Sequence, residues 1–415
     1  MDIKPSSSYH PEHNKGITES IGATKIDLSE AGLLAQARQE TGLERFGDES
    51  FLPALRIFLK SLEDEAQLNT IGRLHAQGNT VGSLKNRLWA NACFEAHPEI
   101  LQRKIVAPII IIGPHRSGTT RMHRMMATDS RLQHLKTWEG FNPAPRLGLP
   151  DLGKQARYEE VDGFLTGAQP MYPGAFVGHP MHADWAEEEM LLLNHSFCSF
   201  SVLGTYTIPS YYQWFTESDK TAGYRYMADL MKLISWSRGD TEDKRWVLKN
   251  PQHMLDLDIL LKVFPDAKLV FSHRDPIKTV ASIMSLMWHF AVLHTDRPIR
   301  AAMRDVWLDF CERAARRCIQ ARESIPAEQQ LDVYYEDMNS NWRGVMRRIY
   351  DFGGIELSAA AEQGMAAWLT QSETENRHGG HRYSLEDFGI TDEEVDERMM
   401  FFRERYATPY ESRAR

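Results

Sequence analysis

The segment from Gly113 to Thr120 carries residue types that suit anion binding. Its two glycines and its last threonine fit the nucleotide-triphosphate loop G-x-x-x-x-G-K-[ST], but Thr119 stands where that loop has the lysine that reaches the β- and γ-phosphates. A cation lies inside the segment instead, at Arg116, and the start of a following helix would add backbone N–H groups. The pattern therefore predicts a cradle for a group shorter than a triphosphate. The predicted cradle consists of His115, Arg116, Ser117, Gly118, Thr119 and Thr120.

A second candidate anion site follows an apolar run near the middle of the chain. Arg274 lies in the sequence His-Arg-Asp-Pro at the end of a predicted strand, where α/β sheets bind ligands, and Ser282 follows on the next helix. Taken alone, an arginine in this position is more often part of a structural ion pair, and Asp275 is equally suited to cap the helix. Its combination with the first cradle favours a second phosphate site.

These residues must be positioned by alternating strands and helices. The continuous β-branched run 105–112 is typical of a strand that is buried on both faces of a parallel sheet. The order β-α-β-α predicts a parallel sheet with crossover helices, and thus an α/β fold with a P-loop-like sheet flanked by helices. The further predicted strands are 246–248, 268–272 and 331–335, and the predicted helices are 120–127, 252–264, the stretch from 277, and 391–405.

Composition divides the chain into three parts. Residues 1–25 are rich in Ser, His and Gly and are expected to be disordered. Residues 26–104 show helical spacing of apolar residues, with Ser29 as a candidate N-cap, and predict a helical extension that packs on the main domain. Residues 105–415 form the predicted α/β domain.

Charge and cysteine content exclude several classes of protein. A net charge of −9 argues against non-specific nucleic-acid binding. The four cysteines form no C-x-x-C pair, so neither a disulfide framework nor a metal site is expected. The N-terminus has no signal-peptide-like apolar region, and the longest aliphatic run is too short to span a membrane. We expect a cytoplasmic protein without a transmembrane segment, either a monomer or a homodimer.

Three segments resemble the sulfotransferase family that uses 3′-phosphoadenosine-5′-phosphosulfate (PAPS). They are GPHRSGTT, WVLKNPQHMLDLDILLKVFPDAKLVFSHRDPIKTVASI and DVYYEDM. The similarity covers roughly residues 108–353, and the pattern is most similar to bacterial members with an N-terminal helical extension. It implies that Arg116 to Thr120 bind the 5′-phosphosulfate, that Arg274 and Ser282 bind the 3′-phosphate, that the nucleotide product is PAP, and that no metal is required.

The sequence departs from the family pattern at two places. Arg116 stands where the family often has lysine, which replaces a point charge by a forked guanidinium. The Arg-Lys-Gly element that often closes over the 3′-phosphate is not evident, and Arg377, in RHGGHRYSLEDFG, is its candidate counterpart.

Sulfuryl transfer needs positioning, a cation near the bridging oxygen, and a base for the acceptor proton. Arg116 is the first candidate cation, and Lys249, at a strand end, is the second. His253 and Glu139 are the two candidate bases: a histidine titrates near neutral pH, and several relatives carry a catalytic glutamate after the first helix. The alternatives to a sulfotransferase are a P-loop nucleotide kinase or phosphotransferase and a non-catalytic protein that binds PAPS or PAP.

The acceptor is a small molecule that the sequence does not identify. The stretch HPMHADWAEEE, with His179, His182 and Glu188, is interpreted as either a wall of the acceptor pocket or a solvated helix start. Trp138 and other aromatic residues suggest an apolar pocket, although the same residues equally suit a core. A hydroxylated lipid, sterol, phenol or secondary metabolite is the acceptor hypothesis. The other aromatic residues are Tyr172, Phe176, Trp185, Phe197, Phe200, Tyr211 and Trp214.

Overall fold

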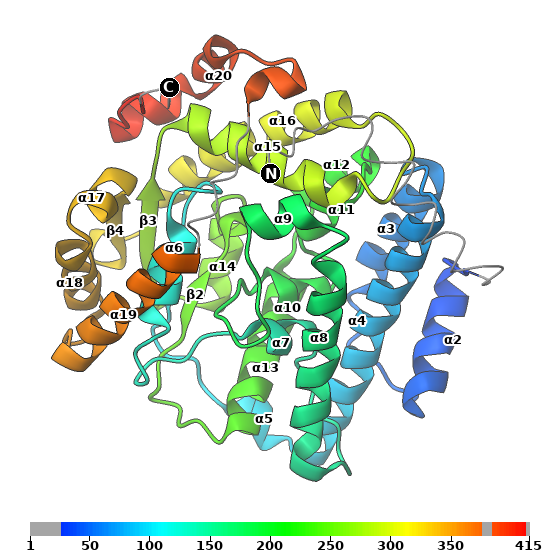
Figure 1. Cartoon of the computed structure of the whole chain (residues 1–415). Helices are drawn as coiled ribbons and strands as arrows, with labels where there is room; N and C mark the ends of the chain where they lie inside the picture. The colour runs from blue at the N-terminus through cyan, green and yellow to red at the C-terminus, as the bar shows by residue number, and fades with distance from the viewer. Residues whose placement is uncertain (1–25, 376–383, 412–415) are drawn as a thin grey trace.

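The computed structural model describes residues 26–375 and 384–411 and centres on a four-stranded sheet (Figure 1). All described pairings in this sheet are parallel, and the strand order is β2-β1-β3-β4. This confirms the predicted α/β class with a parallel sheet. Because parallel strands run in one direction, the segments that follow β1, β2 and β3 meet at one edge of the sheet. The strands are β1 Ile109–Ile112, β2 Val247–Lys249, β3 Lys268–His273 and β4 Gln330–Tyr334.

Strands β1, β2 and β3 are buried on both faces, because alternate side chains of each enter different hydrophobic cores. Ile109 and Ile111 of β1 pack with α6, α18 and α19, whereas Ile110 and Ile112 belong to a larger core on the other face. The helices of the first face are α6 Thr119–Met126, α18 Trp342–Gly353 and α19 Ala359–Glu375. The second face is covered by α13 Thr221–Arg238, α14 Leu257–Val263, α15 Pro276–Ala291 and α16 Arg300–Arg322.

Two predicted elements were wrong in extent. The first strand begins at Ile109 rather than at residue 105, because Ala107 has a φ of 40° and its N–H donates to the Asp266 carboxylate at 2.7 Å. The expected helix 252–264 is two helices, η3 Pro251–Met254 and α14. The break lies at Asp256, whose carboxylate is held in the core by Lys220 at 2.9 Å and by Gln252 at 3.0 Å.

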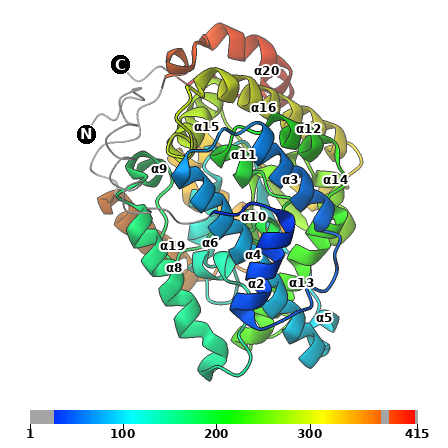
Figure 2. The ribbon, with the colours of Figure 1, turned by 90° about the vertical axis from the view of Figure 1, so that its right-hand side faces the viewer.

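The N-terminal helices pack on the rest of the molecule, as Figure 2 shows from the side. Ser29 caps α2, since its hydroxyl accepts from the Gly32 N–H at 3.1 Å. Phe58 of α3 and Leu88 of α4 lie in the same core as the second face of the sheet. The domain boundaries at 26–104 and 105–415 stay a prediction. The helices are α2 Glu30–Thr41, α3 Leu52–Asp64 and α4 Thr70–Ala96.

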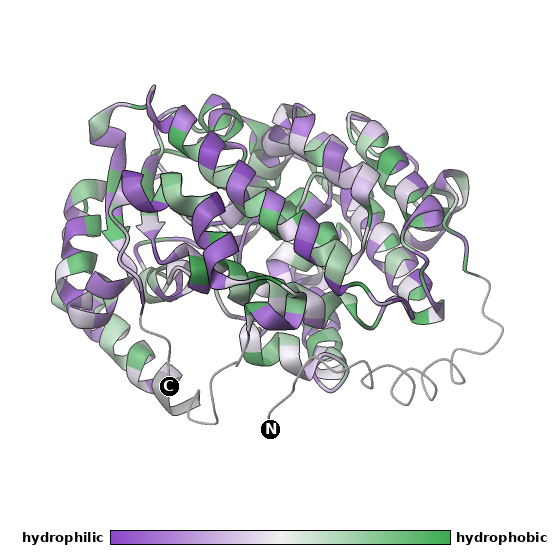
Figure 3. Ribbon diagram, turned by 90° about the horizontal axis from the view of Figure 1, so that it is seen from above, coloured by the Kyte–Doolittle hydropathy of each residue, from purple (hydrophilic) through white to green (hydrophobic). Residues whose placement is uncertain are grey.

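The remaining helices are short or lie at the periphery. Hydrophilic and hydrophobic residues alternate along most helices, as expected of surface helices that bury one side (Figure 3). Within residues 26–375 and 384–411, the structure has no helix that is both long and apolar enough to cross a membrane. The other helices are α5 Glu99–Gln102, α7 Thr137–Phe141, η2 Pro150–Gly153, α8 Lys154–Ala168, α9 Pro173–Gly178, α10 Met190–Asn194, α11 Ser201–Thr205, α12 Pro209–Glu217, η4 Ala327–Gln329, α17 Tyr335–Ser340, η6 Leu385–Phe388 and α20 Asp392–Tyr406.

Candidate functional site

The predicted anion cradle is a tight loop that leads from β1 into α6. Gly113 has to be glycine, because a Cβ there would lie 2.7 Å from the Ser272 carbonyl oxygen of β3. The Ser272 hydroxyl donates to the Ser117 carbonyl at 2.6 Å and thereby fixes the loop to that strand. Gly118, with a φ of 86°, is the N-cap of α6, and none of the described side chains caps the helix. The first-turn N–H groups of α6 are therefore available to an anion.

Arg116 joins this loop to the second predicted anion site. It has a φ of 66°, and its side chain is exposed. Its Nε donates to the Ser282 hydroxyl of α15 at 3.2 Å, and its Nη1 donates to the Gly178 carbonyl at 2.6 Å. Arg274, directly after β3, donates to the Arg116 carbonyl at 2.6 Å. The structure thus brings Arg116, Arg274 and Ser282 together, at one edge of the sheet.

A carboxylate that the sequence gave no reason to single out holds Arg274. Glu411, beyond α20, accepts from Arg274 Nε at 2.6 Å and from Arg274 Nη2 at 2.8 Å. The Glu411 N–H donates to Asp275 at 2.8 Å, and Asp275 also caps α15 through the Ile277 N–H. The guanidinium of Arg274 stacks 3.8 Å from the centre of the Tyr335 ring. The Glu411 carboxylate therefore binds Arg274, the arginine of the predicted 3′-phosphate site.

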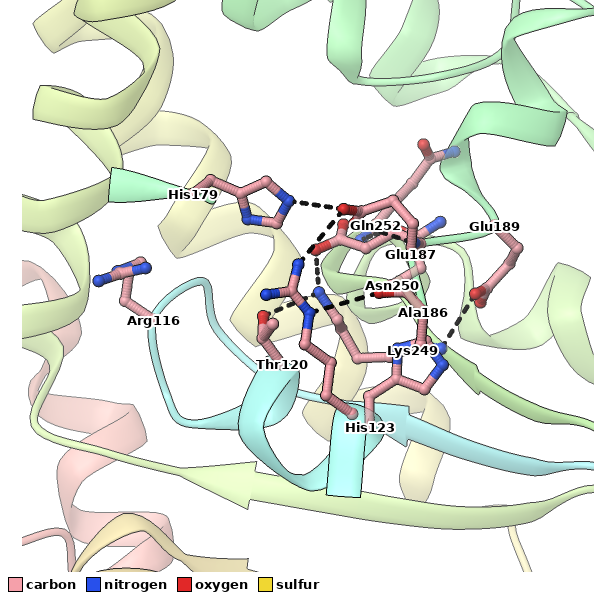
Figure 4. A network of polar contacts seen from close by, with 12 residues as sticks. Arg116, Thr120, His123, His179, Ala186, Glu187, Glu189, Lys249, Asn250 and Gln252 are labelled. Carbon is pink, nitrogen blue, oxygen red and sulfur yellow. Dashed lines mark hydrogen bonds and ion pairs between the residues drawn. The ribbon is translucent and has the colours of Figure 1, made fainter. Parts of the chain in front are cut away.

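Lys249 provides a buried cation at the start of α6. It is the last residue of β2, is 1% exposed, and donates from Nζ to the Thr120 hydroxyl at 3.1 Å. Its Nζ also contacts Glu188 in an ion pair, and Figure 4 shows Lys249 next to Thr120. Burial raises the pKa of Glu188, and the Lys249 ammonium opposes this rise only in part. A cation and a carboxylate with a raised pKa thus lie beside the predicted cradle.

The two glutamates that flank Glu188 face other partners. Glu187 lies 3.0 Å from His179 Nε2 and 3.7 Å from Arg124. Although burial alone would raise the pKa of Glu187, the nearby His179 and Arg124 lower it well below its usual value. Glu189 accepts from the Lys249 N–H at 2.9 Å. The acidic triplet of HPMHADWAEEE therefore belongs to this site, which excludes the interpretation of a solvated helix start for the triplet.

The two candidate bases are fully engaged within the core. His253 is 0% exposed, with Nε2 at 2.6 Å from Glu189 and Nδ1 at 3.0 Å from the Tyr224 hydroxyl. Glu139 is buried and accepts from Arg238 Nε at 2.7 Å, with a second contact between Arg238 and its other oxygen. In both candidate bases, the polar atoms of the side chain are therefore already hydrogen-bonded to other protein groups.

Other predicted residues lie at the margin of this cluster or outside it. His115 packs edge-on against Phe200 with ring centres 5.0 Å apart, and burial lowers the pKa of His115 to about 3, so its ring is neutral. His182 is exposed, and Trp138 is buried in a small apolar cluster with Val161. Arg377 lies outside the described residues. Within the described part of the chain, no group of three or more His, Cys, Asp or Glu residues is arranged to hold a metal ion.

The parallel sheet, the glycine loop that leads from β1 into α6, and the arginines after β1 and β3 define an α/β protein with a P-loop-like anion site. The family model described as "Sulfotransferase family" matches residues 108–359. The chain therefore belongs to the sulfotransferase family.

Individual relatives support the same assignment. The solved structure of the sulfotransferase STF1 from Mycobacterium tuberculosis H37Rv is 31% identical, covers 90% of this chain and 99% of its own, and gives a TM-score of 0.77. The sulfotransferase STF9 from Mycobacterium avium is 24% identical over 94% of this chain and 100% of its own, with a TM-score of 0.81. The omega-hydroxy-beta-dihydromenaquinone-9 sulfotransferase of Mycobacterium tuberculosis (strain CDC 1551 / Oshkosh) is 23% identical over 255 residues, which are 60% of this chain but only 63% of that relative.

Proposed function

We propose that the chain is a sulfotransferase that moves a sulfuryl group from PAPS to the hydroxyl group of a small-molecule acceptor. The observation that carries this proposal is the direct contact between the two predicted anion sites. Arg116 donates to Ser282 at 3.2 Å, and Arg274 donates to the Arg116 carbonyl at 2.6 Å. PAPS carries one anionic group at each end of its nucleoside, so it fits two such sites at one edge of the sheet. A triphosphate carries its charge on a single chain and does not require the second anion site.

The residues around the loop fit a donor of this kind. Arg116 and the first-turn N–H groups of α6 would hold the 5′-phosphosulfate, and Arg274 with Ser282 would hold the 3′-phosphate. The bidentate contact between Arg274 and Glu411 supports the second assignment, because the guanidinium donates there to two anionic oxygens. Bound PAPS would supply an activated sulfuryl group on its 5′-phosphate. Arg377 remains part of the proposal as a further 3′-phosphate ligand.

Lys249 and Glu188 are the groups that we assign to the transfer itself. The Lys249 ammonium, in contact with Thr120 at the start of α6, would stabilise the negative charge that develops on the leaving phosphate. The Glu188 carboxylate would accept the proton of the acceptor hydroxyl while that oxygen forms its bond to sulfur and the bond from sulfur to the phosphate oxygen breaks. The raised pKa of Glu188 suits this role. The ring of His253 is instead hydrogen-bonded on both nitrogens, and Glu139 is held by Arg238.

The acceptor is proposed to be a hydroxyl-bearing apolar molecule. One mycobacterial relative carries an omega-hydroxy-beta-dihydromenaquinone in its name, which supports a hydroxylated lipid among the candidates lipid, sterol, phenol and secondary metabolite.

Donor binding and transfer are tested separately. Calorimetry should show binding of PAP to the wild type, weaker binding to Arg116→Ala, and little binding of ATP with Mg²⁺.

Lys249→Met should reduce transfer to a panel of alcohols by about a hundredfold or more, as loss of a transition-state charge contact does. Lys262→Met, on the exposed surface of α14, is the matched control and should transfer normally. Tight ATP binding without PAP binding would support the kinase alternative, and PAP binding without transfer to any alcohol would support the non-catalytic one.

The pH dependence tests Glu188 directly. Because burial raises the pKa of Glu188 above the ordinary value of 4.5, the deprotonated base should form only at higher pH. The transfer rate should therefore rise with pH in a window above 4.5. Glu188→Gln should lower the rate and remove this rise. A Gln variant with the wild-type rate and profile would exclude Glu188 as the base.

A further inference from the structure

A groove of about 240 Å³ lies beside the candidate site, between α4 and α8. Residues of α7, α10 and α11 also line it. Figure 2 shows the molecule from this side, with α8 beside α4. The groove opens to solvent at Gly78 and Asn79, which are exposed. One wall therefore comes from the N-terminal helices, to which the sequence assigned no role.

The groove is uncharged where a ligand would touch it. Its apolar wall includes Phe141, Phe164, Leu191 and Phe197. None of the described lining residues is Lys or Arg. The single lining carboxylate, Glu160, is held by Arg146 in a bidentate pair.

The polar groups of the groove are also neutral. Burial lowers the pKa of His195 to about 4, so this ring is uncharged near neutral pH. The Ser201 hydroxyl donates to Asn194 at 2.6 Å, and Thr205 donates to the Ser201 carbonyl at 3.1 Å. The Ser201 and Thr205 hydroxyls are therefore both donors within the protein, and neither they nor His195 carries a charge. An anionic acceptor would find no countercharge here.

Small residues of α4 keep the groove open. A Cβ at Gly78 or at Gly82 would meet no atom within 4 Å, although both residues lie inside a helix, where glycine is unfavourable. Between them lies Thr80, which is 2% exposed and lines the groove. Its hydroxyl has no hydrogen-bond partner among the described residues. A buried hydroxyl without a partner normally costs stability.

The inner end of the groove adjoins the proposed catalytic residues. Leu191 lines the groove and donates its N–H to the Glu188 carbonyl at 3.2 Å, so the two residues are one turn apart. Ser201 and Val202 line it from α11, and the preceding residue, Phe200, packs against His115 of the anion loop. The lining of the groove is thus connected to Glu188 through Leu191, and to the anion loop through Phe200.

We propose that this groove binds the tail of the acceptor, and that the acceptor is an uncharged, elongated apolar alcohol whose hydroxyl reaches Glu188 and Lys249. In this arrangement α4 is a wall of the acceptor site, and the glycines at 78 and 82 set the width of the groove. The inference rests on the proposed function, because it assigns the acceptor class of that same site.

The test fills the groove and measures binding and transfer independently. Gly82→Leu directs a side chain into open space within a helix, so it should not lower the melting temperature. Gly163→Leu is the matched control, because Gly163 lies on the exposed side of α8, does not line the groove, and also has open space at its Cβ. The probes are dodecanol with a dansyl label for binding, and ethanol, octanol and dodecanol as acceptors for transfer from PAPS.

The wild type and Gly163→Leu should bind the dansyl alcohol, whereas Gly82→Leu should bind it about tenfold more weakly or worse. Gly82→Leu should lose transfer to octanol and dodecanol, but it should keep transfer to ethanol and keep PAP affinity. Equal binding of the dansyl alcohol by all three proteins would overturn the groove assignment, even if transfer is active. Failure of the wild type to bind PAP would reject the proposed donor instead, and the fluorescence result would still decide the groove.

Discussion

Glu411 is the described residue that most directly tests the second anion site. Its carboxylate forms two hydrogen bonds to Arg274, the arginine assigned to the 3′-phosphate. If that assignment is correct, the carboxylate and the 3′-phosphate compete for one guanidinium. Glu411→Gln removes the competing charge but keeps the shape of the side chain, so it should increase the affinity for PAP.

The size of the gain follows from the environment of the pair. The side chains of Arg274 and Glu411 are 13% and 21% exposed, so the contact is partly buried. Fully exposed ion pairs contribute about 0.2–1 kcal/mol, and hydrogen bonds to charged groups contribute about 1.5–3 kcal/mol. Relief of a partly buried pair should therefore be worth about 1–2 kcal/mol, which corresponds to a roughly 5- to 30-fold tighter complex with PAP.

Calorimetry with two nucleotides separates this effect from a general change of charge. PAP should bind more tightly to Glu411→Gln, whereas adenosine 5′-phosphate, which lacks the 3′-phosphate, should bind both proteins equally. Glu404→Gln is the matched control, because Glu404 is exposed on α20 and the substitution changes the net charge equally. The reasoning is refuted if Glu411→Gln leaves PAP affinity unchanged, or if it strengthens both nucleotides alike.

Three further predictions concern stability and pH. Glu139→Gln should lower the free energy of unfolding by about 2–3 kcal/mol, because it leaves Arg238 without its buried partner; denaturant unfolding measures this, and unchanged stability with lost transfer would favour Glu139 as the base. Thr80→Val should raise that free energy by about 1 kcal/mol, because it removes a buried hydroxyl without a partner; a lower denaturation midpoint would contradict this. Partial burial alone would raise the pKa of Asp332, but the hydrogen bond from His273 helps to lower it below 3.8, so its contribution is present above pH 3.8 and is lost as the pH falls further. The difference in melting temperature between the wild type and Asp332→Asn should shrink below that pH, and a constant difference would contradict the assignment.

Local signals in the sequence were sufficient for the sheet and the anion loop. The β-branched run before Gly113 is typical of a strand buried on both faces, and the loop and helix after it followed from glycine positions and helix chemistry. The start of that strand was misplaced because the hydrophobic run continues past the point where Ala107 takes a positive φ. Burial on both faces gives no periodicity that would indicate where pairing begins.

Contacts between distant segments could not be predicted in the same way. Glu411 lies 137 residues from Arg274, and neither residue type nor spacing indicates that the C-terminal segment returns to β3. The groove is a similar case. In sequence, Gly78 and Gly82 only weaken a predicted helix, and their role as a wall depends on α8 lying opposite.

The acidic triplet shows most clearly why the base could not be chosen from residue types. Glu187, Glu188 and Glu189 are chemically identical and adjacent, yet each lies beside a different cation or imidazole. They precede α10, so no helical period relates their directions. The pKa of Glu187 is lowered by His179 and Arg124, whereas burial raises the pKa of Glu188 despite Lys249. A general base must be deprotonated before the reaction and must take up a proton during it, and a raised pKa favours that uptake. Glu188 therefore suits the role better than Glu187, and only the residues packed around each glutamate distinguish the two.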